Sequence, residues 1–186
     1  QLIKLEDIPQ HIKDAFLAVE DSDFNEHIGV DIKGVLRAAK QRLLNEPIQT
    51  GGSTITQQVA RRVFLSFDQS MSRKAKEIFL AVRIERFMTK DQILLAYLNK
   101  IPFGNSSTGN YVYGIQAAAK GIFDVDDLDQ LNIAQAAYLA GLPQDPNRYS
   151  AFNSRGEHNE AGYNLAKKRQ ELVLKRMLEE EKITQK

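Results

Sequence analysis

The sequence predicts a mainly α-helical fold, and three observations support that class. Apolar residues recur every three or four positions through most of the chain, and capping-type residues precede several of these stretches. No alternating strand pattern of useful length is present. A length of 186 residues suits one domain that is large enough to bury a core, so we expect a single domain over residues 1–186.

The N-terminal half is expected to form five helices, over about residues 5–19, 28–43, 54–65, 73–87 and 89–98. Two of these helices begin with the capping-box spacing, which joins Thr54 to Gln57 and Thr89 to Gln92. The run from Asn45 to Gly52 contains one proline and two glycines, so it is expected to be a loop.

The C-terminal half is expected to continue with helices over about residues 115–122, 131–140 and 161–182. Residues 102–114 are rich in Gly, Ser, Asn and Thr, which predicts an extended loop before the first of these helices. Pro143 and Pro146 indicate an irregular stretch before the last one.

Composition excludes several classes of protein. The net charge of +1 argues against a strongly basic nucleic-acid binder, and we expect no nucleic-acid partner. The chain contains no cysteine, which excludes disulfides and thiolate chemistry. No apolar run approaches the roughly 18 residues of a membrane span. Because the chain starts at Gln1 and lacks a signal peptide, we expect it to be excised from a longer protein.

The most informative local feature is the block Gly51-Gly52-Ser53-Thr54-Ile55-Thr56-Gln57-Gln58. Its glycines allow a turn and its capping box opens a helix, whose unpaired N–H groups suit a phosphate or another anion. Gln58, Arg61 and Arg62 follow at helical spacing and add further donors. An ordinary capped surface helix is the commoner meaning of such a block in isolation.

Two groups of carboxylates are candidates for catalysis. Glu20 and Asp21 lie where a helix meets a loop, and crowding with partial burial would suit one of them as a general base. On a helix, Arg73 and Lys76 share a face with Glu77, so two cations beside a carboxylate could clamp a diphosphate. A solvated acidic helix end and a salt-bridged surface helix are the simpler alternatives.

Weaker signals remain open. The spacing of the three histidines makes a zinc site unexpected, and His27 is expected to be structural, bonding a loop carbonyl. Asn99 could place an amide near a sugar, or could simply end a helix. The basic amphipathic stripe over 28–43 fits a lipid surface and fits packing against the core equally well.

Taken together and in order, these motifs resemble those of the peptidoglycan glycosyltransferases (glycosyltransferase family 51). The first three motifs are matched by Glu20-Asp21-x-x-Phe24-x-x-His27-x-Gly29, by Gly52-Ser53-Thr54-Ile55-Thr56-Gln57-Gln58 and by Arg73-Lys74-x-x-Glu77. The fourth is similar to Tyr97-Leu98-Asn99-x-Ile101-x-x-Gly104 with Gly114-Ile115-x-Ala117-Ala118, and the fifth to the region 131–149. The resemblance covers about residues 8–177.

The resemblance implies a lysozyme-like helical fold with two lobes around a cleft, the smaller lobe associating with the membrane. It implies polymerisation of lipid II into β-1,4-linked glycan strands. The donor would be a glycan chain on undecaprenyl diphosphate, which leaves as the configuration inverts. The acceptor would be the GlcNAc 4-hydroxyl of lipid II. Moenomycin is an inhibitor known to act on the family.

The resemblance also implies roles for matching residues. Glu20 would be the general base, and Glu77 would orient cations and favour positive charge on the donor sugar. The substrate-binding residues would be Asp21, Ser53, Thr54, Gln57, Gln58, Arg73, Lys76 and Asn99, with Arg61 as a further candidate by geometry. Lys74 matches the motif, but helical geometry is expected to turn it about 100° away.

The family further implies a divalent cation (Mg²⁺ or Mn²⁺) at the diphosphate and no organic cofactor. It implies an N-terminal transmembrane anchor at the extracytoplasmic face of a bacterial membrane, and other cell-wall synthesis and division proteins as partners. The loop before Gly52 would be a candidate gate for the lipid substrate. The Gly141-Leu142-Pro143-Gln144-x-Pro146 form resembles bifunctional penicillin-binding proteins, so we expect a parent of that class.

Departures and alternatives accompany this expectation. Gln135 stands where a Glu is usual in the family, Ser150-Ala151 replaces Asn-Pro, and 121–125 differs from a Tyr-Phe-x-Lys run. A lysozyme-like lytic transglycosylase or hydrolase would also use a Glu in a helical cleft, but it would have no use for a diphosphate clamp. A non-catalytic module bound to membrane or cell wall is the second alternative.

Overall fold

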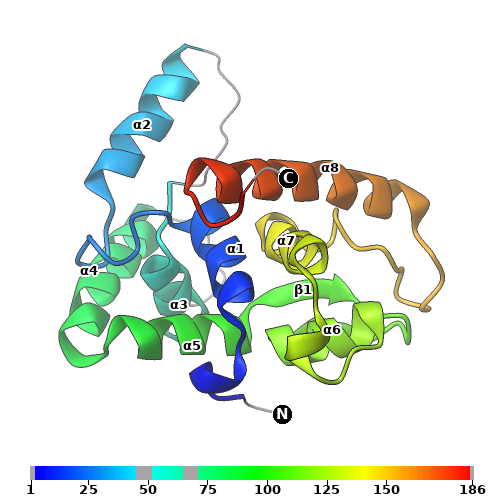
Figure 1. Cartoon of the computed structure of the whole chain (residues 1–186). Helices are drawn as coiled ribbons and strands as arrows, with labels where there is room; N and C mark the ends of the chain where they lie inside the picture. The colour runs from blue at the N-terminus through cyan, green and yellow to red at the C-terminus, as the bar shows by residue number, and fades with distance from the viewer. Residues whose placement is uncertain (1–2, 45–51, 65–70, 185–186) are drawn as a thin grey trace. The chain divides into compact units, whose positions relative to one another are not determined.

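The computed structural model describes residues 3–44, 52–64 and 71–184. Within these ranges the chain is mainly helical, as predicted, with eight α-helices and one small sheet (Figure 1). The helices are α1 Gln10–Glu20, α2 Ile32–Leu43, α3 Ile55–Phe64, α4 Met71–Phe87, α5 Lys90–Lys100, α6 Ile115–Phe123, α7 Ile133–Gly141 and α8 Glu160–Glu179. Short 3₁₀ turns lie at η1 Leu5–Asp7, η2 Leu128–Gln130 and η3 Leu142–Gln144.

The loop predicted over residues 102–114 is wrong, because most of this segment forms a β-hairpin. Strands β1 Pro102–Asn105 and β2 Tyr111–Tyr113 pair antiparallel, with Asn105 opposite Tyr111. The strands have only four and three residues, so they are too short to show an alternating pattern. Ser106, Ser107, Gly109 and Asn110, which contributed to the loop prediction, lie in the turn between the strands, where Gly109 has a φ of +82°.

Internal contacts divide the chain into two compact units. The first contains residues 1–19 and 98–186, and the second contains residues 20–97. Two helices, α1 and α5, run through the points of division.

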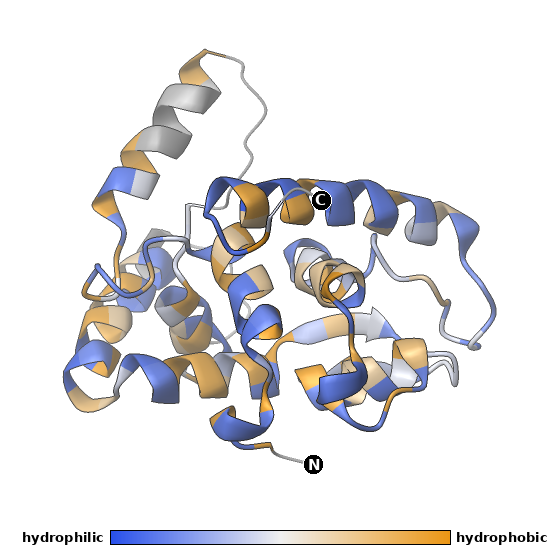
Figure 2. Cartoon of the chain, viewed as in Figure 1, coloured by the Kyte–Doolittle hydropathy of each residue, from blue (hydrophilic) through white to orange (hydrophobic). Residues whose placement is uncertain are grey.

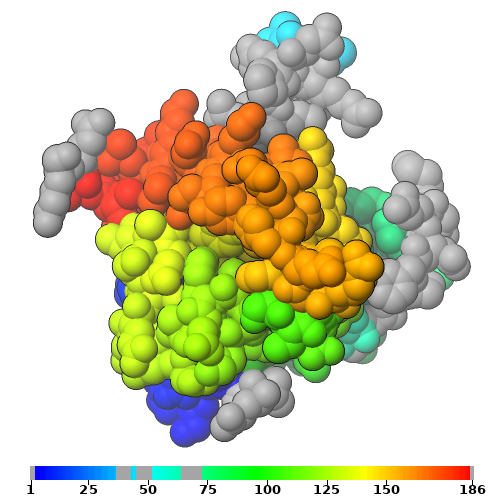
Figure 3. Space-filling model, turned by 90° about the vertical axis from the view of Figure 1, so that its right-hand side faces the viewer, coloured from blue at the N-terminus to red at the C-terminus, as the bar shows by residue number. Residues whose placement is uncertain are grey.

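In the first unit, α7 packs along α8 (Figure 1). Small side chains make close packing possible, because Ala136, Ala137 and Ala140 of α7 are fully buried. An edge-to-face contact between Phe16 and Phe103, with ring centroids 6.1 Å apart, links α1 to β1. Figure 3 shows the segment of α8, orange to red, forming part of the surface of this unit.

In the second unit, α3 packs on α4, and both helices contribute buried residues. The loop between α1 and α2 approaches α4 closely at Gly29, which has a φ of +97°. A Cβ atom there would lie 2.7 Å from the carbonyl carbon of Ala81, so only glycine fits. This close approach fixes the loop that carries the first motif.

Helix α2 begins at Ile32, and Ile28, which was expected to lie on its stripe, precedes it. Figure 1 shows α2 extending away from α3, α4 and α5 of the same unit, and the part of its ribbon that is coloured in Figure 2 contains both apolar and polar residues. Ile28 and Ile32 are 72% and 70% exposed, so packing against the core does not explain them. The expected loop over 45–52 lies almost wholly outside the described residues. Across the described ranges, none of the helices has the length and apolar character of a membrane span.

Candidate active site

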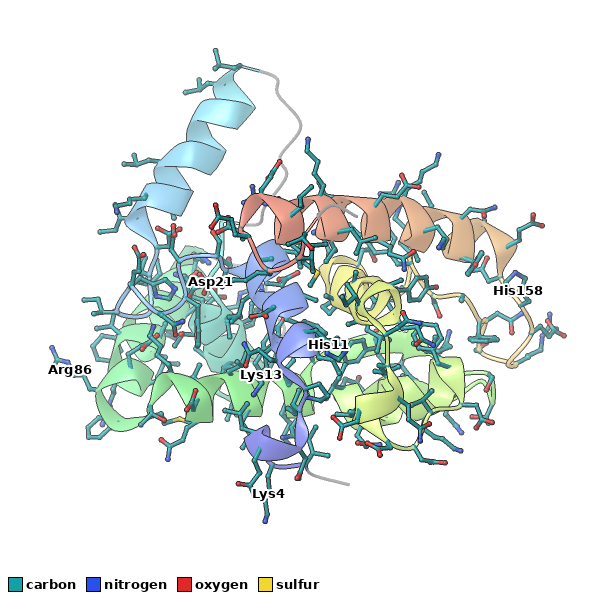
Figure 4. All side chains as sticks on the ribbon, in the orientation of Figure 1. Lys4, His11, Lys13, Asp21, Arg86 and His158 are labelled. Atoms are coloured by element: carbon teal, nitrogen blue, oxygen red, sulfur yellow. The ribbon has the colours of Figure 1, made fainter. Side chains whose placement is uncertain are left out.

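Asp21, a buried residue that directly follows α1, is hydrogen-bonded to another residue of the first motif (Figure 4). His27 Nε2 lies 2.9 Å from both carboxylate oxygens of Asp21, and the backbone N–H of Gly29 donates to His27 Nδ1 at 3.1 Å. Because Nδ1 accepts, the proton of the neutral ring is on Nε2 and is donated to Asp21. The expectation that His27 bonds a loop carbonyl is therefore wrong, since its ring bonds a carboxylate.

The Asp21 side chain also caps the start of α3. Its Oδ2 accepts from the backbone N–H of Ile55 at 2.9 Å, which places a negative charge at the positive end of that helix. The capping box predicted for Thr54 and Gln57 is confirmed, with bonds of 3.1 and 3.2 Å in the two directions. These backbone donors were expected to bind an anion of the substrate, but two of them are already satisfied by Asp21 and Thr54.

Thr54 is a buried cap with a second function. Its hydroxyl donates to the carbonyl of Gly29 at 2.7 Å, so it ties the start of α3 to the loop of the first motif. Asp21 and Thr54, both predicted to bind substrate, are thus engaged in holding the two motifs together. Their side chains shape the site from below its surface.

Glu20, the predicted general base, lies beside α3. Gln58 Nε2 donates to Glu20 Oε2 at 2.7 Å, and Glu20 is half-buried at the end of α1. Ile55, which bonds Asp21, and Gln58, which bonds Glu20, are three residues apart on α3 and so lie on the same side of the helix. The first turn of α3 therefore holds both adjacent carboxylates. This arrangement fixes the direction of the Glu20 carboxylate.

Glu77 is fully buried, and its cation is Lys74. Lys74 Nζ donates to Glu77 Oε1 at 2.6 Å and to Ser53 Oγ at 2.9 Å, and it lies 3.4 Å from Gln57 Oε1. The prediction that Lys74 faces away is wrong, because residues at i and i+3 are also neighbours on a helix. Among the described residues, Glu77 Oε2 is buried without a hydrogen-bond partner.

The two predicted catalytic carboxylates are connected through α3. Glu20 accepts from Gln58, and the connection continues covalently along the α3 backbone to Gln57, whose Oε1 lies 3.4 Å from the Lys74 ammonium that donates to Glu77. Tyr97 lies near its first end: burial, and next the charge of Glu20, raise the pKa of the Tyr97 phenol. Since all these residues belong to the second unit, the structure brings the first three motifs together within it.

The other predicted site residues are placed less closely. Arg61 and Arg73 are half-buried in the second unit, whereas Lys76 is exposed. Asn99 belongs to the first unit, where its side-chain amide exchanges two 3.1 Å hydrogen bonds with the backbone of Ile3. Arg86, by comparison, projects outward from the end of α4 (Figure 4).

Three polar residues near the site were missed by the sequence analysis. Thr56 Oγ1 donates to Glu85 Oε1 at 2.6 Å, and Lys90 Nζ donates to the same oxygen at 2.7 Å. These residues come from three different helices, so no local spacing could have paired them. One available signal was Lys90, a charged residue at helical spacing from the apolar residues Ile93 and Leu94.

The arrangement combines an oriented carboxylate with a buried carboxylate–ammonium pair. An oriented carboxylate can accept a proton from a hydroxyl, and cations with hydroxyl and amide groups can hold a diphosphate. Among the residues that the structure describes, no group of three or more His, Asp or Glu side chains is placed to hold a metal.

Comparison with known proteins identifies the family of the chain. A family model described as Transglycosylase matches residues 1–178. Penicillin-binding protein 1A of Pseudomonas aeruginosa is 49% identical over 148 residues, 80% of this chain and 17% of that protein. Penicillin-binding protein 1A of Escherichia coli is 44% identical over 183 residues, 98% of this chain and 20% of that protein. Penicillin-binding protein 1F of Bacillus subtilis is 42% identical over 148 residues, 80% of this chain and 20% of that protein.

The chain thus spans about a fifth of the length of these relatives. Homology to penicillin-binding protein 1A indicates a cell-envelope protein. With the ordered motifs and the family match over nearly its whole length, the chain belongs to the transglycosylase family and is a peptidoglycan glycosyltransferase domain homologous to those of the class A penicillin-binding proteins.

Proposed function

We propose that this domain polymerises lipid II by inverting transfer of a glycan chain from undecaprenyl diphosphate. The observation that supports this most directly is the connection through α3 between Glu20 and the Lys74–Glu77 pair, all within one compact unit. A hydrolase would need the carboxylates but would not need Lys74 and Ser53 beside them.

In the proposed reaction Glu20 is the general base. It removes the proton from the GlcNAc 4-hydroxyl of the acceptor as that oxygen forms a bond to the anomeric carbon of the donor MurNAc. Gln58 holds one oxygen of the Glu20 carboxylate at 2.7 Å, so less motion has to be arrested when the acceptor arrives. The bond to the diphosphate oxygen breaks at the opposite face of the sugar, and its electron pair leaves with the diphosphate.

The diphosphate is proposed to bind beside Lys74. Its ammonium already contacts Ser53 and its side chain is 40% exposed, so it can bind an anion while Glu77 holds it from the buried side. Arg73 and Lys76 lie on the same helix and would supply further positive charge, with Gln57 and Arg61 adding donors from α3. Glu77 would balance these cations and favour positive charge on the donor sugar.

A divalent cation at the diphosphate remains a proposal from the family alone. The described residues offer no set of three carboxylate or histidine ligands, and a cation there would supply charge neutralisation to the diphosphate. The cationic side chains would supply charge neutralisation as well, and the proposed transfer uses no organic cofactor.

The site is proposed to work at a membrane surface, on the extracytoplasmic side, where lipid II is presented. Support comes from the exposed apolar residues that precede and follow the start of α2, namely Ile28, Ile32, Val35 and Leu36. Such residues on a helix with basic neighbours suit insertion at a lipid interface. A two-lobed cleft, an anchored bifunctional parent and cell-wall synthesis partners are further parts of this proposal, carried by the family resemblance.

Incubation of the protein with lipid II in detergent or bilayers tests the proposed function. We expect glycan strands that lengthen with time and release of undecaprenyl diphosphate. Degradation of preformed glycan without strand growth would show a lytic enzyme and overturn the proposal. Binding of lipid II without either reaction would show a non-catalytic module.

A further inference from the structure

Lys90 is a cation of the second unit that makes several contacts and that the proposed reaction does not use. Its ammonium donates to Glu85 Oε1 at 2.7 Å and to the backbone carbonyl of His27 at 2.7 Å, and it lies 4.6 Å from the centre of the Phe24 ring. The Lys90 side chain is 24% exposed and the Glu85 side chain 8%. Lys90 therefore joins the start of α5 to the end of α4 and to the loop of the first motif.

Glu85 extends this contact to α3. The same oxygen that receives Lys90 also accepts from Thr56 Oγ1 at 2.6 Å, one residue after the Ile55 amide that bonds Asp21. A single carboxylate oxygen thus receives an ammonium from α5 and a hydroxyl from α3. Hydrogen bonds to charged groups in a partly buried place are the stronger kind, so this junction resists displacement.

Two sets of hydrogen bonds connect the cluster of Lys90, Glu85 and Thr56 to the proposed base Glu20. The loop held at the His27 carbonyl carries the His27 ring that bonds Asp21, and it carries the Gly29 carbonyl that bonds Thr54. Asp21 adjoins Glu20 in the chain, and α3 carries Gln58, which bonds Glu20 directly. Lys90 therefore acts on both partners of the Glu20–Gln58 contact without touching either.

We propose that Lys90, acting through Glu85 and the His27 carbonyl, is a positioning residue that holds the base Glu20 in its reactive orientation. This inference rests on the proposed function, since orientation matters only if Glu20 accepts the proton. Replacing Lys90 by methionine keeps the aliphatic length but leaves the His27 carbonyl without its donor and Glu85 without its cation. The loop and the first turn of α3 then move independently.

The expected result is a selective loss of turnover. In Lys90→Met, kcat for lipid II polymerisation falls roughly 10- to 100-fold, as for a small misplacement of a reacting group, while KM changes less than about two-fold. Lys90→Arg keeps a cation for Glu85 and recovers at least half of the loss on a logarithmic scale. Lys100→Met is the matched control, because Lys100 is exposed at the other end of the same helix, and it leaves kcat unchanged.

The measurement is made per folded molecule, at a temperature well below the unfolding midpoint of each variant. A merely structural lysine would lower that midpoint and leave kcat unchanged, and this result would overturn the inference. Amide exchange at Ile55 and Gly29, whose N–H groups bond Asp21 and His27, gives a second readout. Both amides exchange at least about ten-fold faster in Lys90→Met, and unchanged exchange would also overturn the inference.

The two proposals fail in different ways. If the wild-type protein makes no glycan strands, the proposed function is wrong, and so is the catalytic part of the Lys90 inference. If the wild-type protein polymerises lipid II and Lys90→Met does so equally well, the proposed function stands and only the Lys90 inference is wrong.

Discussion

The pair of Lys74 and Glu77 is a close ion pair of the proposed donor site, and its energy can be worked from the structure. At an effective dielectric constant of about 20, opposite charges at the observed 2.6 Å attract by roughly 6 kcal/mol. Taking the Glu77 carboxylate out of water costs several kcal/mol of this. Because the Lys74 side chain is 40% exposed, solvent screens the pair further. We expect a net coupling of about 2 kcal/mol.

A double-mutant cycle measures this coupling. Lys74→Met leaves a buried carboxylate without its cation, so it should cost about 2–3 kcal/mol of unfolding free energy, below the roughly 3–5 kcal/mol for a fully buried pair. The double variant Lys74→Met/Glu77→Gln should cost about 2 kcal/mol less than the sum of the single variants. Urea unfolding at neutral pH and low salt gives all the values.

The neighbouring Lys76 is the matched control, because it lies on the same helix and is exposed. Lys76→Met should change the unfolding free energy by less than about 0.5 kcal/mol. A coupling between Lys74 and Glu77 below about 0.5 kcal/mol would refute the reasoning, since it would mean that Glu77 is held by other groups.

Two further predictions concern the neighbourhood of Glu20. Thr54→Ala should lower the free energy of unfolding by about 2 kcal/mol and Thr89→Ala by about 1 kcal/mol, as measured by urea unfolding. Both threonines belong to capping boxes, but only Thr54 is buried and also donates to the Gly29 carbonyl. Equal costs for the two variants would contradict this prediction. For Tyr97, burial raises the pKa, so its phenol stays protonated in the folded protein while the unfolded chain ionises above about pH 10. Stability from this group is therefore complete below about pH 10 and falls above it by at most about 1.4 kcal/mol per pH unit. Tyr97→Phe should remove that slope between about pH 9 and about pH 11, and an unchanged slope would show that Tyr97 does not cause it.

Much of the fold could be predicted because helical periodicity and capping boxes are local. The boxes at Thr54 and Thr89 both form as their spacing indicated. The hairpin at 102–113 was missed because short strands carry almost no periodic signal, and its pairing depends on contacts across the turn.

The site was predicted in its residues but not in its connections. The predicted direction of Lys74 is wrong because Glu77 is the i+3 neighbour of Lys74 as well as the i+4 neighbour of Arg73, and both spacings bring side chains together on a helix. The hydrogen bond between Asp21 and the Ile55 amide at the start of α3 joins residues 34 positions apart, and no pattern within either motif predicts it. Tertiary hydrogen bonds of this kind decide which donors remain for a substrate.

The most direct test of the account is polymerisation of lipid II by Glu20→Gln, measured beside binding of moenomycin, which acts at the donor site of this family. The variant keeps the size of the side chain but cannot accept the proton of the acceptor hydroxyl. The account predicts that strand formation is abolished, by at least about 100-fold in kcat for loss of a general base, while moenomycin binding changes little. Near wild-type turnover in Glu20→Gln would contradict the assignment of Glu20 as the base and with it the proposed mechanism.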